Sequence, residues 1–407
     1  MSAHQASLRF ILVTVFLDVL GIGLMIPVLP SLVGTLTANP DDQAWWFGAL
    51  ATTYGIMQFL CSPLLGALSD RYGRRPVLLL SMAGLGFSYI VTSVTDSLLL
   101  LLLSRVVSGA TGASFSVANA YVADITVPEQ RGKAFGAIGA AFGVGFVFGP
   151  VIGGLLGSQD LRLPFMVAAL LSFINVLYGY YVLPESLSAE RRSPLTLQRI
   201  NPLSALAHLS ELKGVAPLVL IFMLASLSQF ILQNTWVLYT EFRFDWKPWQ
   251  NGIALFVVGM TSALVQGVLM SRLLHRFGEM RLIMLGLTSS TLAYLCYGLI
   301  TNSLWLYPVI MANFLSFAVT PALQTLISRA ATAGEQGLVQ GSLNGINSIM
   351  IVIAPLIGAT LLAKVGHLPR EDWRLGVTFF LCAGLQMLAL GMAVRLFRAS
   401  RTGRTGN

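Results

Sequence analysis

One charged segment, Gly66-Ala67-Leu68-Ser69-Asp70-Arg71-Tyr72-Gly73-Arg74-Arg75-Pro76, joins two apolar runs at residues 46–67 and 77–95. Runs of this length match what a helix rising about 1.5 Å per residue needs to cross about 30 Å of hydrocarbon. Of the 407 residues, 55% are hydrophobic and 10% are charged, whereas soluble proteins carry about 25% charged residues. Barrel strands would alternate polar and apolar residues, and these runs do not. The sequence therefore predicts an all-α membrane protein.

Working outward from this segment, we predict twelve transmembrane helices in two pseudo-equivalent six-helix bundles. The first bundle (1–183) holds spans at 9–31, 46–67, 77–95, 98–123, 133–157 and 164–183. A polar linker (184–214) leads to the second bundle (215–407), with spans at 216–239, 250–273, 282–300, 304–328, 337–362 and 374–396.

The basic residues predict how these spans are oriented. The net charge is +8, and most arginines and lysines fall in the segments on one side, which the positive-inside rule assigns to the cytoplasm. All seven tryptophans fall near the opposite span ends, as an interfacial aromatic belt would place them. Both termini are therefore expected in the cytoplasm, and the basic charge indicates topology and no nucleic-acid partner.

The two halves repeat each other in sequence. Arg71-Tyr72-Gly73 recurs as Arg276-Phe277-Gly278, and Gly149-Pro150-Val151-Ile152-Gly153-Gly154 recurs as Ala354-Pro355-Leu356-Ile357-Gly358-Ala359, both 205 residues later. Glu129-Gln130 recurs 206 residues later as Glu335-Gln336. Two equivalent halves place a substrate path at their interface near the bilayer midplane.

Two charges fall inside spans and are candidates for proton coupling. Asp18 lies about ten residues, or roughly 15 Å, from the inner boundary of its span. An aspartate at the bilayer centre costs about 2.5–3.5 kcal/mol on insertion scales, so an idle one is not expected. Arg105 shares one helix face with Ser108, Gly109, Gly112, Ser116 and Asn119. Alternate exposure of Asp18 could load and release a proton; the alternative is a static ion pair with Arg105 that fixes helix packing.

Uncharged polar residues inside spans give a candidate substrate pocket. These are Gln58, Asn119, Gln229, Gln233, Gln266, Asn313, Gln324, Asn344 and Asn347. Hydrogen-bonding groups in an apolar cavity suit an amphipathic ligand, although each residue could equally join two helices.

The fifth span is rich in glycine and contains Gly139, Gly143, Gly145, Gly149, Pro150, Gly153, Gly154 and Gly157. Helical spacing puts Gly139, Gly143, Pro150, Gly153, Gly154 and Gly157 on one face, where another helix could approach closely.

Other chemistries lack the residues that they need. The three cysteines lie in apolar spans without CxxC spacing, and the four histidines lie outside spans, so we expect no metal site and no catalytic residues. No GxxxxGK[ST] nucleotide loop occurs. The first apolar run has no small-residue cleavage site and contains Asp18, so it is interpreted as an uncleaved span.

The segment at residues 66–76 resembles the signature loop of the major facilitator superfamily. The resemblance implies a cytoplasmic gate that involves Asp70, Arg71 and Arg74, with Arg74 paired to Asp124; the alternative is that these charges only anchor the topology. Leu102-Leu-Ser-Arg105-Val-Val-Ser108-Gly109-Ala-Thr-Gly112 resembles a second motif of the family, in which the arginine helps to move protons; here the alternative is a structural hydrogen bond to backbone carbonyls. The glycine pattern of the fifth span resembles the motif of drug:proton antiporters.

The resemblance narrows to the tetracycline-exporter group. It rests on Gly21-Ile-Gly-Leu-Met-Ile-Pro-Val-Leu-Pro30, Trp236-Val-Leu-Tyr-Thr-Glu-Phe-Arg-Phe244, Pro321-Ala-Leu-Gln324 and Glu335-Gln336-Gly337. Where the group has an acid, a histidine and another acid in spans three, eight and nine, this chain has Ser88, Ser262 and Ser290.

This resemblance implies a multi-pass transporter of the bacterial inner membrane that exports a small amphipathic compound in exchange for protons. It implies a monomer that uses the proton gradient, without ATP or a cofactor. The alternative is proton-coupled uptake or efflux of an endogenous metabolite. A membrane enzyme or receptor is a third class, for which we find no constellation of residues.

Overall fold

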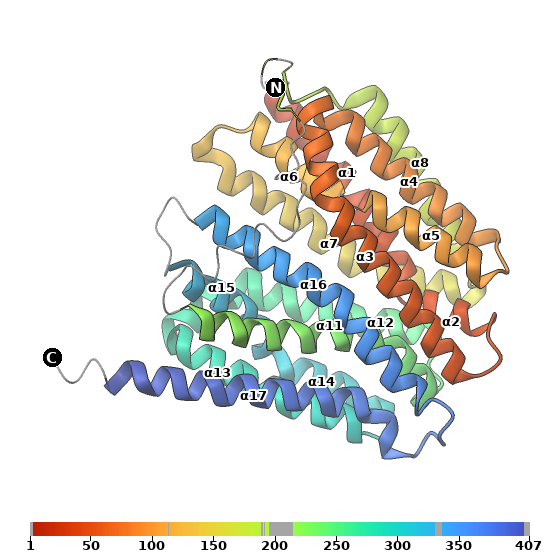
Figure 1. Ribbon diagram of the computed structural model, residues 1–407, viewed down its shortest axis with the longest axis vertical. Coiled ribbons are helices and arrows are strands. Elements are labelled where there is room, and N and C mark those ends of the chain that lie inside the picture. The colour runs from red at the N-terminus through yellow and green to blue at the C-terminus, as the bar shows by residue number, and fades with distance from the viewer. Residues whose placement is uncertain are drawn as a thin grey trace. The chain divides into compact units, whose positions relative to one another are not determined.

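The computed structural model describes residues 3–112, 114–188, 190, 192–194, 215–329 and 336–402. Within these ranges the chain is built of helices and contains no strand, so the predicted all-α fold is confirmed (Figure 1). Most of the predicted linker 184–214 lies outside the described residues, and the division into two bundles with this linker stays a prediction.

By length and composition, ten stretches of the described chain could cross a membrane. One of them, Pro248–Leu299, covers two of the predicted spans because its 52 residues continue through a kink. The predicted span at 46–67 lies inside the helix Pro40–Tyr72, which is not among the ten.

The described chain forms two compact units. Unit 1 holds the described residues of Met1–Ala38, Ala49–Pro202 and Trp246–Phe256. Its elements are α1 (Ala3–Met25), α2 (Leu29–Gly34), most of α3 (Pro40–Tyr72), α4 (Arg74–Val94), α5 (Leu98–Thr111), α6 (Ser114–Ile125), η1 (Pro128–Gln130), α7 (Arg131–Gln159), α8 (Leu163–Val182) and the start of α12 (Pro248–Leu264).

Unit 2 holds the described residues of Asn39–Gly48, Leu203–Asp245 and Val257–Asn407. Its elements are the start of α3, α11 (Ala216–Phe244), the rest of α12, the π-helical turn η4 (Val265–Leu269), α13 (Met270–Leu299), η5 (Ser303–Trp305), α14 (Leu306–Ala312), η6 (Asn313–Ala318), α15 (Val319–Arg329), α16 (Gln336–Ala363), η7 (Trp373–Gly376) and α17 (Val377–Thr402).

Two predicted spans are broken at a proline or a glycine, and another glycine marks the kink between two neighbouring spans. The first divides into α1 and α2 around Pro27, because proline removes a backbone donor. The fourth divides at Gly112 into α5 and α6. Gly278 has a φ of +69° inside α13 and separates the eighth span from the ninth.

The glycines of α7 form two packing faces. Gly145, Gly149 and Gly153 contact α1: a Cβ on Gly149 would lie 2.7 Å from the Cα of Gly23, and one on Gly153 would overlap the Leu24 carbonyl. Figure 1 shows α1 and α7 side by side. Because glycine lets backbones touch, this pair of helices packs more closely than side chains would allow.

The second face differs in part from the single face predicted from the sequence. Its outer part contacts the start of α12, since a Cβ on Gly154 would lie 2.5 Å from the carbonyl oxygen of Pro248. A Cβ on Gly139 or Gly143 would meet no described atom outside its own helix backbone within 4 Å. The predicted single face is thus divided, because Gly153 packs against α1 and Gly154 against the start of α12.

Candidate functional site

Asp18 is buried in the middle of α1, where its side chain meets the first residue of α6. The Ser114 hydroxyl donates a hydrogen bond to Asp18 Oδ2 over 2.5 Å. Asp18 is 8% exposed and Ser114 is 6% exposed. A hydroxyl can donate to a carboxylate and can also accept from a carboxylic acid, so this contact serves both protonation states of Asp18.

Arg105 lies on α5 among neutral partners. Its Nη1 donates to Met25 Sδ at 2.9 Å, and its Nη2 donates to Ser88 Oγ at 3.3 Å and to Thr92 Oγ1 at 3.1 Å. Arg105 is 2% exposed, and its Nε has no hydrogen-bond partner among the described residues. Asp18 and Arg105 form no ion pair in the described structure, so the static pair considered from the sequence is not what holds these helices together.

Two tyrosines lie close to these charges. Tyr89 on α4 is 3.7 Å from where a Cβ on Gly21 would stand, one turn along α1 from Asp18. Gln58 Nε2 donates to the Tyr54 hydroxyl at 3.3 Å and to the Gly112 carbonyl at 3.2 Å. Gln58, a predicted binding residue, thus lies at the break between α5 and α6.

The sequence missed Ser114, for a structural reason. A continuous fourth span places Ser116 on the face of Arg105, but the break at Gly112 changes the helical phase. Ser114 then turns toward α1. The sequence signal that could have indicated this contact is Gly112, two residues before Ser114, because a glycine can interrupt a helix.

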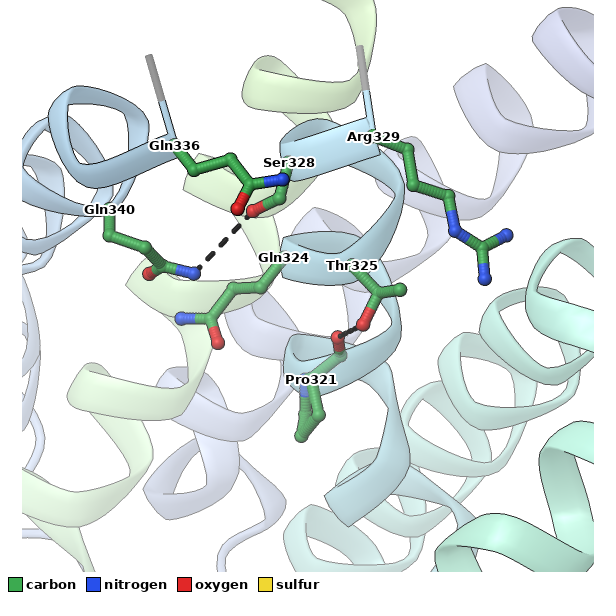
Figure 2. Close-up of a pocket in the computed structure, with 7 residues that line it drawn as sticks. All are labelled: Pro321, Gln324, Thr325, Ser328, Arg329, Gln336 and Gln340. Atoms are coloured by element: carbon green, nitrogen blue, oxygen red, sulfur yellow. Dashed lines mark hydrogen bonds between the residues drawn. The ribbon is translucent and has the colours of Figure 1, made fainter. Parts of the chain in front are cut away.

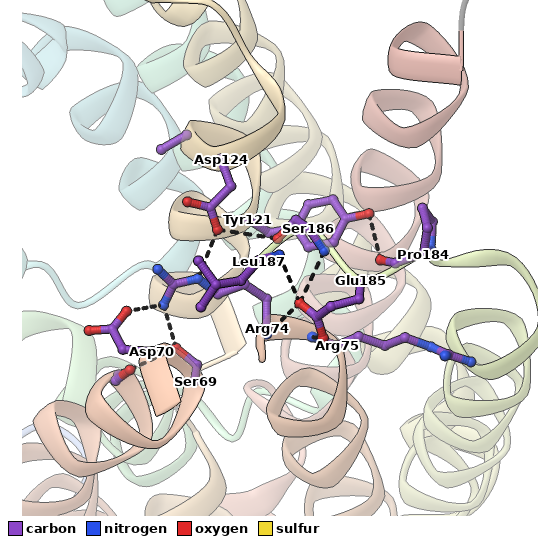
Figure 3. A network of polar contacts seen from close by, with 12 residues as sticks. Ser69, Asp70, Arg74, Arg75, Tyr121, Asp124, Pro184, Glu185, Ser186 and Leu187 are labelled. Atoms are coloured by element: carbon purple, nitrogen blue, oxygen red, sulfur yellow. Dashed lines mark hydrogen bonds and ion pairs between the residues drawn. The ribbon is translucent and has the colours of Figure 1, made fainter. Parts of the chain in front are cut away.

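A second polar cluster joins α3, α4, α6 and the segment after α8 (Figure 3). Arg74 Nε lies 3.0 Å from Asp124 Oδ2, and Arg74 Nη1 lies 2.5 Å from Asp70 Oδ1. Nη1 also donates to Ser69 Oγ at 2.7 Å. Arg74 is therefore held between two carboxylates. This arrangement is strong because hydrogen bonds between charged groups are stronger than those between neutral groups. Arg71 lies outside this cluster; it is exposed and stacks over the Tyr72 ring at 5.2 Å.

Glu185 completes this cluster and was not found from the sequence. Its carboxylate accepts hydrogen bonds from the backbone N–H groups of Arg74 at 2.8 Å and Arg75 at 3.2 Å (Figure 3). These two N–H groups belong to the first residues of α4. At its N-terminus a helix leaves N–H groups unpaired and favours a negative charge. Glu185 is over 100 residues from Arg74 and Arg75 in sequence, so no local pattern indicates the contact.

Several predicted pocket residues join helices or bond within one. Gln229 accepts from the Tyr294 hydroxyl at 3.1 Å, Asn313 accepts from Ser289 at 2.9 Å, and Gln266 donates to Ser262 at 2.9 Å. Asn119 donates to the Phe115 carbonyl within its own helix at 3.0 Å.

Other predicted pocket residues are exposed, line a cavity, or have a buried polar atom without a described partner. Gln233 and Asn344 are exposed, and Asn347 Oδ1 is buried without a partner among the described residues. Gln324 lines a cavity of about 400 Å³ in unit 2, together with Pro321, Thr325, Ser328, Arg329, Gln336 and Gln340 (Figure 2).

The described residues contain no group of three or more His, Cys, Asp or Glu side chains that could hold a metal ion.

Comparison with known proteins gives a consistent result. Residues 11–355 match the Major Facilitator Superfamily. The class C tetracycline resistance protein of Escherichia coli is 40% identical over 94% of this chain and 95% of its own length. The class D protein of Salmonella ordonez is 37% identical over 94% and 96%. The crystal structure of the human organic anion transporter MFSD10 (TETRAN) aligns with a TM-score of 0.69 at 25% identity, covering 97% of this chain and 100% of that one.

Proposed function

The chain belongs to the Major Facilitator Superfamily, and on this premise we propose that it is a secondary transporter that exports a small amphipathic drug, of the tetracycline kind, in exchange for protons. The relatives that support this substrate class align along nearly their whole length. The proposal takes the proton gradient as the energy source, and includes no ATP, no cofactor and no catalytic activity.

The observation that carries proton coupling is the buried contact between Asp18 and Ser114. A carboxylate without a cationic partner at this depth is costly, and taking up a proton removes that cost. The Ser114 hydroxyl can reverse its role when Asp18 is protonated, so both states keep a hydrogen bond. Asp18 would then receive a proton from one side of the membrane and release it on the other, with Arg105 adding a nearby fixed charge.

The cluster around Arg74 supports a gate on the cytoplasmic side. Breaking its contacts to Asp70 and Asp124 would free the turn between α3 and α4 from the end of α6. The cluster therefore suits a contact that forms in one state of the transport cycle and loosens in the other.

We further propose a multi-pass monomer in a bacterial-type inner membrane, with both termini in the cytoplasm. The distribution of basic residues supports this orientation. The substrate pocket would use the amide side chains that are exposed or lack a partner, chiefly Gln233, Asn344 and Asn347.

The decisive experiment compares the unchanged protein with Asp18→Asn in everted vesicles that are supplied with tetracycline and magnesium and energised by a proton gradient. The unchanged protein should accumulate the drug, and a protonophore should abolish accumulation. Asp18→Asn preserves size and hydrogen bonding but cannot titrate, so drug binding should persist while uphill transport is lost.

The matched control is Asp96→Asn, which removes an acid whose side chain is 81% exposed and should leave transport unchanged. Uphill transport by Asp18→Asn, with proton movement intact, would show that another group carries the proton.

A further inference from the structure

The repeat in the sequence is also a repeat in backbone geometry. Gly73 and Gly278 are 205 residues apart, and both have positive φ, +110° and +69°. Each glycine precedes a helical segment, α4 in unit 1 and the second segment of α13 in unit 2. Residues other than glycine rarely adopt a positive φ. A glycine with positive φ at equivalent positions therefore indicates that the two units share the same turn.

The ion pair that follows this turn in unit 1 has a counterpart in unit 2. Arg74 follows Gly73 and pairs with Asp124 at the end of α6. Glu279 follows Gly278 and pairs with Arg329, the last residue of α15, with Oε1 and Nη2 2.6 Å apart. Positions 74 and 279 differ by 205 residues, and so do positions 124 and 329.

The two pairs carry exchanged charges. Unit 1 has the cation after the glycine and the anion on the other helix, whereas unit 2 has the anion after the glycine and the cation on the other helix. Exchanging the two charges preserves the attraction between the helices, but it leaves no identical residues at the equivalent positions. Comparing the sequences of the two halves therefore does not show the pair.

A chance surface pair is the alternative, and most such pairs contribute little. Two observations favour a built pair. The Glu279 side chain is only 20% exposed, although Arg329 is 65% exposed. Both members also occupy the positions that the repeat assigns to the Arg74–Asp124 pair.

We propose that Glu279 and Arg329 are a positioning pair that fixes the end of α15 to the turn of α13, as the charge-exchanged counterpart of Arg74 and Asp124. The proposal rests on the transport function proposed above. Arg329, Ser328, Thr325 and Gln324 form the α15 wall of the cavity in unit 2 (Figure 2). Holding Arg329 in place therefore holds this wall against Gln336 and Gln340 of α16.

The consequence is an effect on substrate capture. The amides and hydroxyls of the cavity suit the hydrogen-bonding groups of an amphipathic compound, whereas the Arg329 guanidinium is engaged by Glu279. When the pair is broken, α15 loses its anchor and the cavity loses its shape, so the KM for transport should rise more than the turnover falls.

The test uses Glu279→Arg, Arg329→Glu and the double exchange, with tetracycline and magnesium as the probe in everted vesicles. Each single variant places like charges together and should raise KM about three- to tenfold, a range typical of lost interactions between charged groups. The double exchange restores the attraction and should return KM to within about twofold of the unchanged protein. Arg272→Glu, a charge reversal at an exposed arginine of α13, should leave KM unchanged.

A double exchange that is no better than the single variants, or a loss of turnover at constant KM, would overturn the proposal. Failure of the proposed function is distinguishable, because the unchanged protein would then take up no tetracycline. In that case, unfolding temperatures in detergent decide, measured for the unchanged protein, the two single variants and the double exchange. Rescue by the double exchange supports the pair, and additive losses refute it.

Discussion

Arg105 is a cation whose described hydrogen-bond partners are all neutral, and this sets its chemistry at the scale of a single residue. A buried guanidinium is tolerated when its donors are satisfied, yet Nε has no described partner, and one Nη1 contact is to the weak acceptor Met25 Sδ. By the resemblance to the tetracycline-exporter group, Ser88 is expected where that group has an acid. In this chain Arg105 therefore meets a hydroxyl, and no carboxylate, at position 88.

The first prediction gives Arg105 a charged partner. Ser88 is fully buried and its Oγ lies 3.3 Å from Arg105 Nη2, so Ser88→Asp should create an ion pair. Ser88→Asn has nearly the same size without the charge and controls for crowding. We expect the Asp variant to exceed the Asn variant in free energy of unfolding by about 1.5–3 kcal/mol, the range for hydrogen bonds to charged groups.

Thermal or denaturant unfolding in detergent measures this difference. The same comparison in an Arg105→Met background should show no advantage for Asp, because the partner is gone. An equal advantage in both backgrounds would mean that the carboxylate does not pair with Arg105.

At the scale of elements, the glycines of α7 fall into two sets, one that packs against another helix and one that does not. The stripe of Gly145, Gly149 and Gly153 holds α1, the helix of Asp18, at backbone contact. Gly139 and Gly143 lie on the other face, where an added Cβ would have no neighbour within 4 Å among the described residues beyond its own helix backbone. Glycine composition alone therefore does not show which positions need glycine.

The second prediction separates these two sets. Gly153→Ala should force α1 away from α7, because the new Cβ would overlap the Leu24 carbonyl, and should lower the free energy of unfolding by about 1–3 kcal/mol. Gly143→Ala, the matched control on the same helix, has room and should be neutral or stabilising by up to about 1 kcal/mol. Unfolding curves of the two variants provide the measurement; equal losses would contradict the assignment of faces.

Sequence reasoning predicted the elements whose cause is local. Long apolar runs require helices in lipid, and the cost of a buried charge singles out Asp18 and Arg105. It could not predict Ser114, because the break at Gly112 resets the helical phase, or Glu185, because that side chain comes from a segment far away in sequence. Residues brought together by packing leave no periodic signal of their own.

At the scale of the whole molecule, the compact units are not contiguous in sequence. The beginning of α3, Asn39–Gly48, belongs to unit 2, and the beginning of α12, Trp246–Phe256, belongs to unit 1. Within unit 2, fully buried Ala44 packs with Leu238 and Leu362, and Gln43 donates to Glu241 Oε1 at 3.1 Å. Asp41 accepts from the backbone N–H of His367 at 2.9 Å.

The last prediction follows from this exchange of segments. A chain that ends at residue 194 lacks Trp246–Phe256, and a chain that starts at 195 lacks Asn39–Gly48, so each half alone leaves buried surface and hydrogen-bonding groups without partners. Each half expressed alone should therefore accumulate severalfold less in the membrane than when the two are expressed together, because unpaired buried groups are costly. Immunoblots of membranes from cells that make one half or both give the measurement. If the second half alone accumulates to a high, stable level, Asn39–Gly48 contributes little to unit 2. If each half raises the level of the other and drug transport returns, each unit needs the segment that the other half supplies.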